Sequence, residues 1–554
     1  MTIKRINELN SRVSSMDKER SSFISHWMEL SDYVEPRRGR FFITDRNKGE
    51  RRNTKIINSR GSQALRTFQS GMFAGIMSPA RPWFKLEPMQ QDLMKSEAVK
   101  QWLWTAENVM RTVFLDSNLY NMAPVALGEV GLFGTAAMSH VDDFDTVAHF
   151  FTHTAGSYYI SQNDKFEVDT FVLKRELTVR QIVQSFGIEN VSPAVKDAFK
   201  TQKLDAWYQV TQFIMPNDKF EPDSPSNLEM PFVSLWYEPA SNEGKFLKES
   251  GFEEFPVHVA RWALTQEDIY GTNSPSMLSL GDIKSLQIME KRKAQAVDKM
   301  VNPPLKGPPS LRDVPVASLP GGLTIYDGDG SKEGLSPIYQ VEPRINELRM
   351  DIDAIERRVN EAYFVDLFLA ISAMEGVQPR NQLELTQRNE ERLLMLGPPL
   401  ERLQQDFLGK IVERTFNQIL RANILPPAPS ELQGSSLNIR FISALAQAQR
   451  AYEVSTIERS ALFAAQLAQI DQQVLDKFNA DEALERYIQL TGATPSLVIP
   501  DEEVQAMRQQ RAEAQQAQAQ AAMQQQQAQA TLHGSQAAKN AVDVGAGLAD
   551  ASAQ

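Results

Sequence analysis

The chain has 554 residues, a formal net charge of −12 and no cysteine. The missing cysteines exclude disulfides, thiol catalysis and cysteine-ligated metals, and they fit assembly in a reducing compartment. The excess of acidic residues argues against nucleic-acid binding over a broad basic surface, so any contact with nucleic acid is expected to be local. We expect no signal peptide in the polar residues 1–5 and, without a run of about eighteen apolar residues, no membrane span.

Residues 1–273 are expected to form a mixed α+β domain. Apolar residues at helical spacing begin with Ile6, Leu9 and Val13, and an amphipathic helix is predicted over 96–120. From about residue 138 to 260 the apolar period shifts towards two. This change predicts strands in the runs 150–160, 168–173, 207–214 and 232–237, with a capped helix at 178–183 inserted among them.

A basic stretch runs from Arg37 to Arg52. Its composition favours a solvated, mobile surface loop. The alternative is an arm that touches a neighbouring subunit or nucleic acid.

A first long helix is predicted over 274–300, because Ser274 can cap it and Pro275 suits its first position. Its apolar residues share one arc of the helical wheel, and its basic residues lie on the opposite arc. A charged stripe opposite an apolar one is typical of any surface helix, so the pattern alone does not indicate DNA binding. The apolar arc contains Ile283, Leu286, Met289, Val297 and Met300, and the candidate channel or inter-subunit residues are Lys284, Lys291, Arg292 and Lys299.

A second helix, predicted over 344–369, carries apolar residues in steps of 3, 4, 3, 4 and 3. This period predicts a narrow seam that packs against another helix. The seam residues are Ile345, Leu348, Ile352, Ile355, Val359 and Ala362. Between the two helices, residues 301–343 are rich in proline and glycine and are predicted to form a small strand-and-loop module.

The rest of the chain is expected to be helical with interruptions. An irregular piece is predicted at 370–380, followed by a long helix that is interrupted at residues 397–399. Residues 441–490 are expected to form two or three alanine-rich helices. Residues 501–554 are dominated by Gln and Ala, and they form either a helix stabilised by copies of itself or a disordered tail.

Motifs for catalysis are weak. His149 and His153 could share a metal on a helix, but the surrounding run predicts a strand, in which they would lie about 13 Å apart. Asp142, Asp143 and Asp145 could serve a metal-dependent nuclease, although a solvated turn is favoured. We therefore assign no catalytic, cofactor-binding or metal-binding residues and expect no enzyme.

Several separate segments, in one order, resemble the portal or head-to-tail connector family of short-tailed bacteriophages. The likeness covers about residues 20–425 and does not anchor the region after 440. The segments are Ser70 to Gly75, Ser78 to Phe84, Arg175 to Gln181, Arg261 to Gly271, Ser274 to Met277, Gly281 to Lys284 and Asn302 to Pro304.

The resemblance implies a mainly α portal fold of wing, stem, clip and crown, with a mixed α+β wing, that assembles as a ring of typically twelve subunits. Double-stranded DNA would pass through the ring without sequence readout during packaging and ejection. The expected partners are terminase, the major capsid protein, scaffold and tail adaptor proteins. The expected location is the portal vertex of the virion, after assembly in the host cytoplasm. A non-ring helical adaptor or scaffold remains the alternative.

Carried onto this chain, the resemblance places the wing at 1–273 and the stem helices at 274–300 and 344–369, with the clip at 301–343 between them. The channel loop would be 370–380, with Met374, Glu375, Gln378 and Arg380 as its candidate residues. The wing helix and its connection would occupy 381–439, the crown 440–500 and the tail 501–554.

Overall fold

The computed structural model describes residues 2–41, 52–222, 224, 226–241, 244–265, 268–301, 303, 305–306, 336–337, 345–373, 395–434, 436–442, 444–469, 477–491, 504–518, 520 and 523–524. The chain divides into two compact units, Met1–Gln449 and Arg450–Gln554. Each unit is described by itself below.

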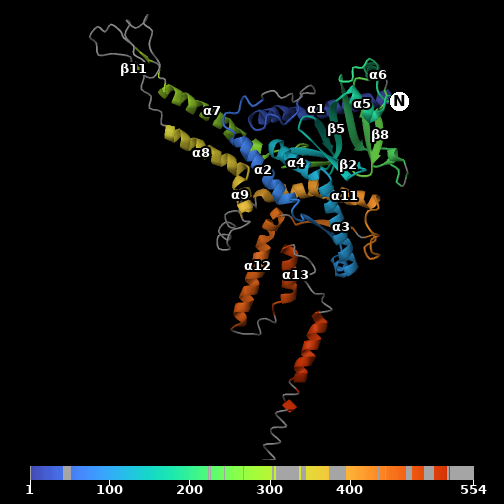
Figure 1. Cartoon of the computed structure of the whole chain (residues 1–554), viewed down its shortest axis with the longest axis vertical. Helices are drawn as coiled ribbons and strands as arrows, with labels where there is room; N and C mark the ends of the chain where they lie inside the picture. Colours follow the sequence, from blue (N-terminus) through green and yellow to red (C-terminus); the bar gives the residue numbers. More distant parts are fainter. Residues whose placement is uncertain are drawn as a thin grey trace, which may run out of the picture. The chain divides into compact units, whose positions relative to one another are not determined.

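A five-stranded antiparallel sheet in the order β4-β5-β6-β7-β8 forms one part of the first unit (Figure 1). Helix α1 (Thr2–Tyr33) packs Ile6, Leu9 and Val13 onto one face, as their helical spacing predicts. The opposite face is covered by two short helices, α5 and α6. The bounds are β4 Tyr158–Gln162, β5 Val168–Thr178, β6 Trp207–Pro216, β7 Phe232–Tyr237, β8 Lys248–Phe252, α5 Val179–Phe186 and α6 Pro193–Lys200.

Arginines on α1 fix this helix to the sheet through aromatic rings. Arg12 lies 5.2 Å from the ring of Phe213, and Arg20 lies 3.7 Å from the ring of Tyr159. Arg20 is buried and donates from one guanidinium nitrogen to the carbonyls of Gly156 and Tyr158, both at 2.8 Å. A buried charge is stable here because its hydrogen bonds replace those it made with water.

The main core lies among helices and a second sheet, β3-β2-β9, which is also antiparallel. Helix α4 packs against both α2 and this sheet, and α11 contacts β3. A separate pair, β1 with β12, joins segments far apart in sequence. The bounds are α2 Arg60–Met77, β1 Phe84–Pro88, α3 Glu97–Asp116, α4 Leu119–Phe133, β2 Thr135–Asp143, β3 Val147–His153, β9 Val257–Arg261, α11 Lys410–Arg421 and β12 Leu437–Phe441, with 3-10 turns at Gln91–Lys95 and Asn227–Glu229.

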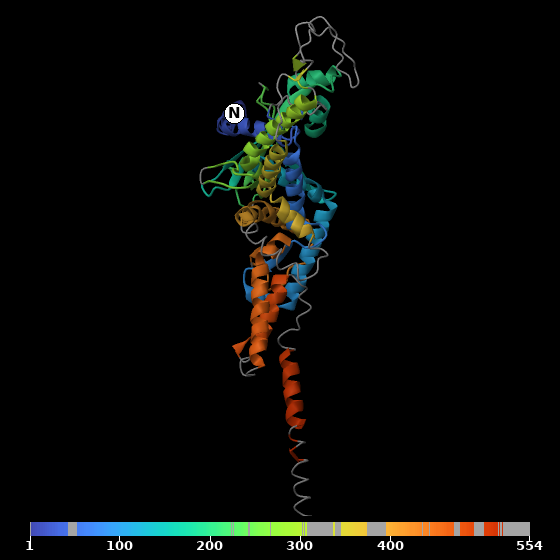
Figure 2. The same ribbon diagram turned by 90° about the vertical axis from the view of Figure 1, so that its left-hand side faces the viewer.

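Two long helices, α7 (Pro275–Val301) and α8 (Ile345–Ala362), lie side by side in both views (Figure 1 and Figure 2). Short strands β10 (Leu305–Lys306) and β11 (Ser336–Pro337) pair antiparallel in the segment between them. Helix α9 (Val365–Ala373) follows α8 and packs on α2. We call α7 and α8 the stem hairpin.

The second unit contains most of α12 (Ala444–Ala468) together with α13 (Ala480–Thr491), and residues 504–518 are also helical. Tyr487 donates a hydrogen bond of 3.2 Å to Glu458, so α13 is tied to α12. Arg508 forms two hydrogen bonds of 2.8 Å with the carboxylate of Asp481, which joins the 504–518 helix to the start of α13. These helices match the alanine-rich helices expected before residue 500, and part of the Gln/Ala tail is helical.

Several predicted boundaries differ from the structure. The run 150–160 is divided between β3 and β4, and the helix predicted over 96–120 ends at Asp116. Helix α8 ends at Ala362, well before residue 369, because Phe364 adopts a positive φ of 55° that no helix contains. Residues 397–399 do not interrupt the helix there: the described helical segment 395–403 includes them.

Candidate stem hairpin and assembly surface

The stem hairpin begins at a tightly packed root. Ser274 caps α7 as predicted, because its hydroxyl accepts a 3.2 Å hydrogen bond from the N–H of Met277 and donates to the carbonyl of Leu132. Nearby, a Cβ on Gly271 would lie 2.1 Å from the carbonyl oxygen of Gly134. Only glycine permits so close an approach, so the start of α7 is fixed to the end of α4.

The two helices of the hairpin are joined by buried and exposed polar contacts. The hydroxyls of Ser276 and Tyr363 are 2.6 Å apart, and both residues are fully buried. Burial raises the pKa of Tyr363 to about 12, so this phenol stays protonated at neutral pH. Further along, Arg358 of α8 forms an ion pair of 2.9 Å with Asp282 of α7.

Gln287 attaches α7 to the segment that leads into α2. Its side-chain oxygen accepts hydrogen bonds from the N–H groups of Ile57 and Asn58, at 2.6 and 2.8 Å, and its amide donates to the carbonyl of Asn58 at 3.0 Å. Asn58 in turn donates to Glu356 of α8 at 2.9 Å, and Arg60 donates to Asn360 at 2.7 Å. The same short segment therefore holds both helices.

The six seam residues lie on α8, and three of them are buried within this chain. Ile352, Ile355 and Val359 have exposed fractions of 3, 8 and 0% and belong to the main core. Leu348 packs against that core, while Ile345 and Ala362 are half-buried. Because α8 contacts α7 and α2, the seam packs against helices of its own chain.

The basic residues of α7 differ in their surroundings. Lys284 forms an ion pair with Glu29 of α1 and lies 5.7 Å from the ring of Tyr33. The carboxylate raises the pKa of Lys284 because it stabilises the charged ammonium. Lys291, Arg292 and Lys299 are exposed on the second half of the helix.

The apolar arc of α7 is buried only over its first half. Ile283 and Leu286 are fully buried, whereas Val297 and Met300 are 42 and 52% exposed. Val301, at the end of α7, and Met350 of α8 are also exposed. The five residues share one arc as predicted, and the chain itself covers this arc only as far as about Met289.

The candidate channel-loop residues Met374, Glu375, Gln378 and Arg380 lie outside the described residues. The same holds for most of 301–343, where only residues 301, 303, 305–306 and 336–337 are described. The Gln/Ala tail is described only in part.

Two arginines in the described part of the basic stretch are held by contacts within the chain. The N–H of Arg40 donates to the carbonyl of Ala155 at 2.8 Å, and its guanidinium pairs with Glu176 at 3.3 Å. Arg38 lies 3.8 Å from the buried Glu129, whose pKa is raised by burial. Residues 38–41 are therefore anchored on the domain, and residues 42–51 of the predicted loop or arm lie outside the described residues.

The weak catalytic motifs are occupied by structural contacts. Asp142 pairs with Arg414 at 3.6 Å and accepts from Gln418, while Asp143 accepts a 3.0 Å hydrogen bond from the N–H of Thr146. His149 and His153 lie on β3, as their strand pattern predicts. Within the described residues, no three His, Asp or Glu side chains come together as a metal site.

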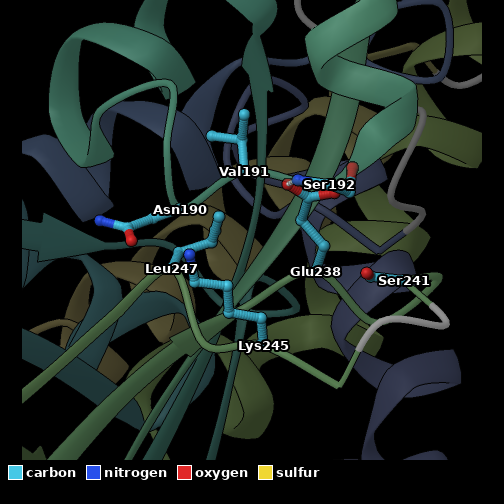
Figure 3. A pocket seen from close by; sticks show the side chains of 7 residues that line it. All are labelled: Asn190, Val191, Ser192, Glu238, Ser241, Lys245 and Leu247. Atoms are coloured by element: carbon cyan, nitrogen blue, oxygen red, sulfur yellow. Dashed lines mark hydrogen bonds between the residues drawn. The ribbon is translucent and has the colours of Figure 1, made fainter.

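A depression beside α6 also holds internal contacts (Figure 3). The carboxylate of Glu238 accepts a 3.3 Å hydrogen bond from the N–H of Ser192, and Lys245 donates to the carbonyl of Glu189 at 2.8 Å. These polar groups are satisfied by the chain itself, so the depression gives no support for a ligand site. None of the described helices is both long enough and apolar enough to span a bilayer.

Comparisons with known proteins give a consistent result. A family model described as "Bacteriophage head to tail connecting protein" matches residues 6–499. The "Portal protein" of Salmonella phage epsilon15 is 40% identical over 511 residues, which cover 92% of this chain and 91% of that protein. The "Probable portal protein" of Bordetella phage BPP-1 is 40% identical over 513 residues, 92% of each chain.

A chain in the solved "Neck of empty GTA particle computed with C6 symmetry" covers 84% of this chain and 98% of its own length, with 9% identity and a TM-score of 0.35. A similarity this low carries no argument about fold or assembly. The family match over most of the chain and the two relatives decide the matter: this chain belongs to the bacteriophage head-to-tail connecting protein family of portal proteins.

Proposed function

We propose that the chain forms a ring of about twelve copies at one capsid vertex, and that double-stranded DNA passes through its central channel. Packaging and ejection both use this channel. Terminase docks at the clip, residues 301–343, while capsid, scaffold and tail adaptor proteins bind elsewhere on the ring. The chain performs no catalysis in this role.

The observation that carries the proposal is the uneven burial of the stem hairpin. Its root is fixed by the chain's own α1, α2 and α4, which contact α7. Its outer half exposes apolar side chains on both helices, with exposed fractions of 52% for Met300 and 68% for Met350. Exposed apolar residues gathered on an otherwise polar pair of helices favour a surface that is covered by another chain.

Neighbouring copies are the partner that we assign to this surface. A contact between two different faces of the same subunit repeats around an axis and closes into a ring when the rotation allows. Copies of α7 and α8, each about 30–40 Å long at 1.5 Å per residue, would then form the wall of a tube. Each α7–α8 pair would be a rigid part of that wall, because the seam of α8 is packed within its own chain.

The exposed Lys291, Arg292 and Lys299 face either the neighbour or the lumen in this arrangement. Each lysine or arginine that meets DNA contributes a salt-dependent contact with phosphate and reads no base. A subunit of net charge −12 with few basic residues at the channel would let DNA slide. We further assign Met374, Glu375, Gln378 and Arg380 to a loop that touches the DNA.

Native mass spectrometry and negative-stain imaging of the purified protein test the proposal. We expect annular particles whose mass is an integral multiple of the subunit mass. Met350→Lys should abolish or weaken the ring while leaving the folded monomer intact, because Met350 is exposed in the single chain. Met89→Lys, at a residue with a similar exposed fraction of 66%, is the matched control and should assemble normally.

A protein that stays monomeric or dimeric over a range of salt and protein concentrations would contradict the ring. A fixed dimer would instead favour the helical adaptor. That alternative relied on the α8 seam as a dimer contact, and the burial of Ile352, Ile355 and Val359 within one chain gives it no support.

A further inference from the structure

Two histidines meet in the interior of the sheet β3-β2-β9. Nδ1 of His140, on β2, lies 3.0 Å from Nε2 of His258, on β9, and the two residues are 0 and 3% exposed. The ring of His140 also packs against Phe150 of β3, with 4.4 Å between the ring centroids. One nitrogen of this contact must donate and the other accept, so the hydrogen bond forms when both rings are neutral. Nε2 of His140 is buried without a hydrogen-bond partner.

A buried arginine of α11 adjoins the histidine pair. Arg414, which is 2% exposed, donates to the backbone carbonyls of His140 and Glu254 at 3.1 and 3.2 Å. Its charge is balanced by Asp142 at 3.6 Å and Glu254 at 4.0 Å. Helix α11 is therefore fastened to the sheet by a cation that lies beside two neutral imidazoles.

The other groups around the pair do not favour an added proton. The remaining charges near the cluster come from α11 and from the residues just before β9: Lys410, Glu413 and Arg421, together with Glu253. Burial lowers the pKa of both His140 and His258 well below its usual range, and the charge of Arg414 lowers both further. For His140, the nearby side-chain oxygen of Gln418 raises the pKa without reversing the shift, because it can accept a proton only from a protonated nitrogen.

We propose that His140 and His258 form a proton-sensitive latch, which holds α11 on the sheet β3-β2-β9 while both rings are neutral and releases it when they are protonated. Protonation would remove the acceptor nitrogen of the pair and place two further positive charges beside Arg414. The weakest boundary is then the one between α11 and the sheet. Because this inference concerns the folded subunit, it does not depend on the ring or on DNA.

The direction of the effect follows from linkage. Since the folded state binds protons less readily than the unfolded state at these histidines, their contribution is fully present above the unfolded pKa of about 6.5 and falls as the pH drops below it. Glu254 acts in the opposite sense, because burial raises its pKa and the folded state takes up its proton more readily. Two histidines thus act in the first sense and one carboxyl in the second.

Hydrogen exchange of the full chain, followed by mass spectrometry between pH 7.5 and 4.5 and corrected for intrinsic rates, tests the latch. Peptides from α11 and β9 should lose protection below about pH 6, before peptides from α2 do. The double variant His140→Phe with His258→Leu removes both partners of the hydrogen bond and should shift this loss to lower pH by about one unit or more.

Two controls keep the test decisive. His258→Gln keeps a hydrogen-bonding side chain without a titrating group, and it replaces the double variant if that variant fails to fold. His26→Gln changes a histidine on α1 and should leave the acid profile unchanged. The latch is overturned if α11 stays as protected as α2 throughout the pH range, or if neither variant at the pair moves the profile.

Discussion

Replacing Gln287 by leucine should loosen the stem hairpin at its attachment to the segment before α2. The side chain of Gln287 is 5% exposed and makes three hydrogen bonds to the backbone of Ile57 and Asn58. Leucine fills nearly the same space but offers neither a donor nor an acceptor. Two N–H groups and one carbonyl would then lose their partners at the same point.

The magnitude follows from the burial of those groups. An unsatisfied buried donor or acceptor costs about 1–3 kcal/mol. Ile57 is 55% exposed, so water can reach part of this backbone and the three costs do not add in full. We therefore expect Gln287→Leu to reduce the local stability by about 2–4 kcal/mol.

Hydrogen exchange at residues 57 and 58 measures the effect directly, because these are the amides that Gln287 accepts from. A loss of 2 kcal/mol corresponds to an increase in the exchange rate of about 30-fold. Gln295→Leu is the matched control, since Gln295 is exposed on the same helix and should have no effect. If both amides exchange as fast in the natural protein as in Gln287→Leu, the attachment does not exist in solution.

Three further substitutions probe the hairpin and the contact between α2 and α9 beside it. Ile352→Asp buries an unpaired charge, so it should destabilise the hairpin by about 4 kcal/mol or more. Thermal unfolding of the monomer should show this loss independently of any effect on assembly. Tyr363→Phe leaves the buried hydroxyl of Ser276 without this partner, and denaturant unfolding should show a loss of about 1–2 kcal/mol. Gly71→Ala places a Cβ 2.2 Å from the ring of Phe368. This overpacking should destabilise α9 by about 1–3 kcal/mol, and the hydrogen-exchange rates of its amides should rise accordingly.

Periodicity predicted the parts of the fold in which neighbouring residues alone determine the outcome. The steps of 3 and 4 between Ile352, Ile355 and Val359 identify α8 and its buried face, because a helix presents such residues on one side. Ser274 identified the start of α7 because capping depends on one side chain and the next turn. Strands β5, β6 and β7 followed from their alternating and β-branched residues in the same way.

Features that depend on distant segments were missed. Gln287 lies one turn after Ile283 on the apolar arc, and this position was a usable signal, but its backbone partners lie 229 and 230 residues away in the sequence. The helix break after α8 could not be predicted from a glycine or proline, because the residue with the positive φ is Phe364. Anchoring of Arg38 and Arg40 likewise depends on Glu129 and Glu176, which no local pattern connects to them.

The half-exposed arc of α7 shows why a sequence pattern cannot say which chain covers a surface. Ile283 and Val297 satisfy the same period, yet one is fully buried and the other is 42% exposed in the single chain. An isolated pair of helices gains little stability from propensity, because most helical stability in proteins comes from packing an apolar face. The outer half of the hairpin must therefore draw its stability from the firmly held root or from another molecule. Its hydrogen-exchange protection should accordingly fall from Leu286 towards Met300 in the free subunit and become uniform once that outer face is covered.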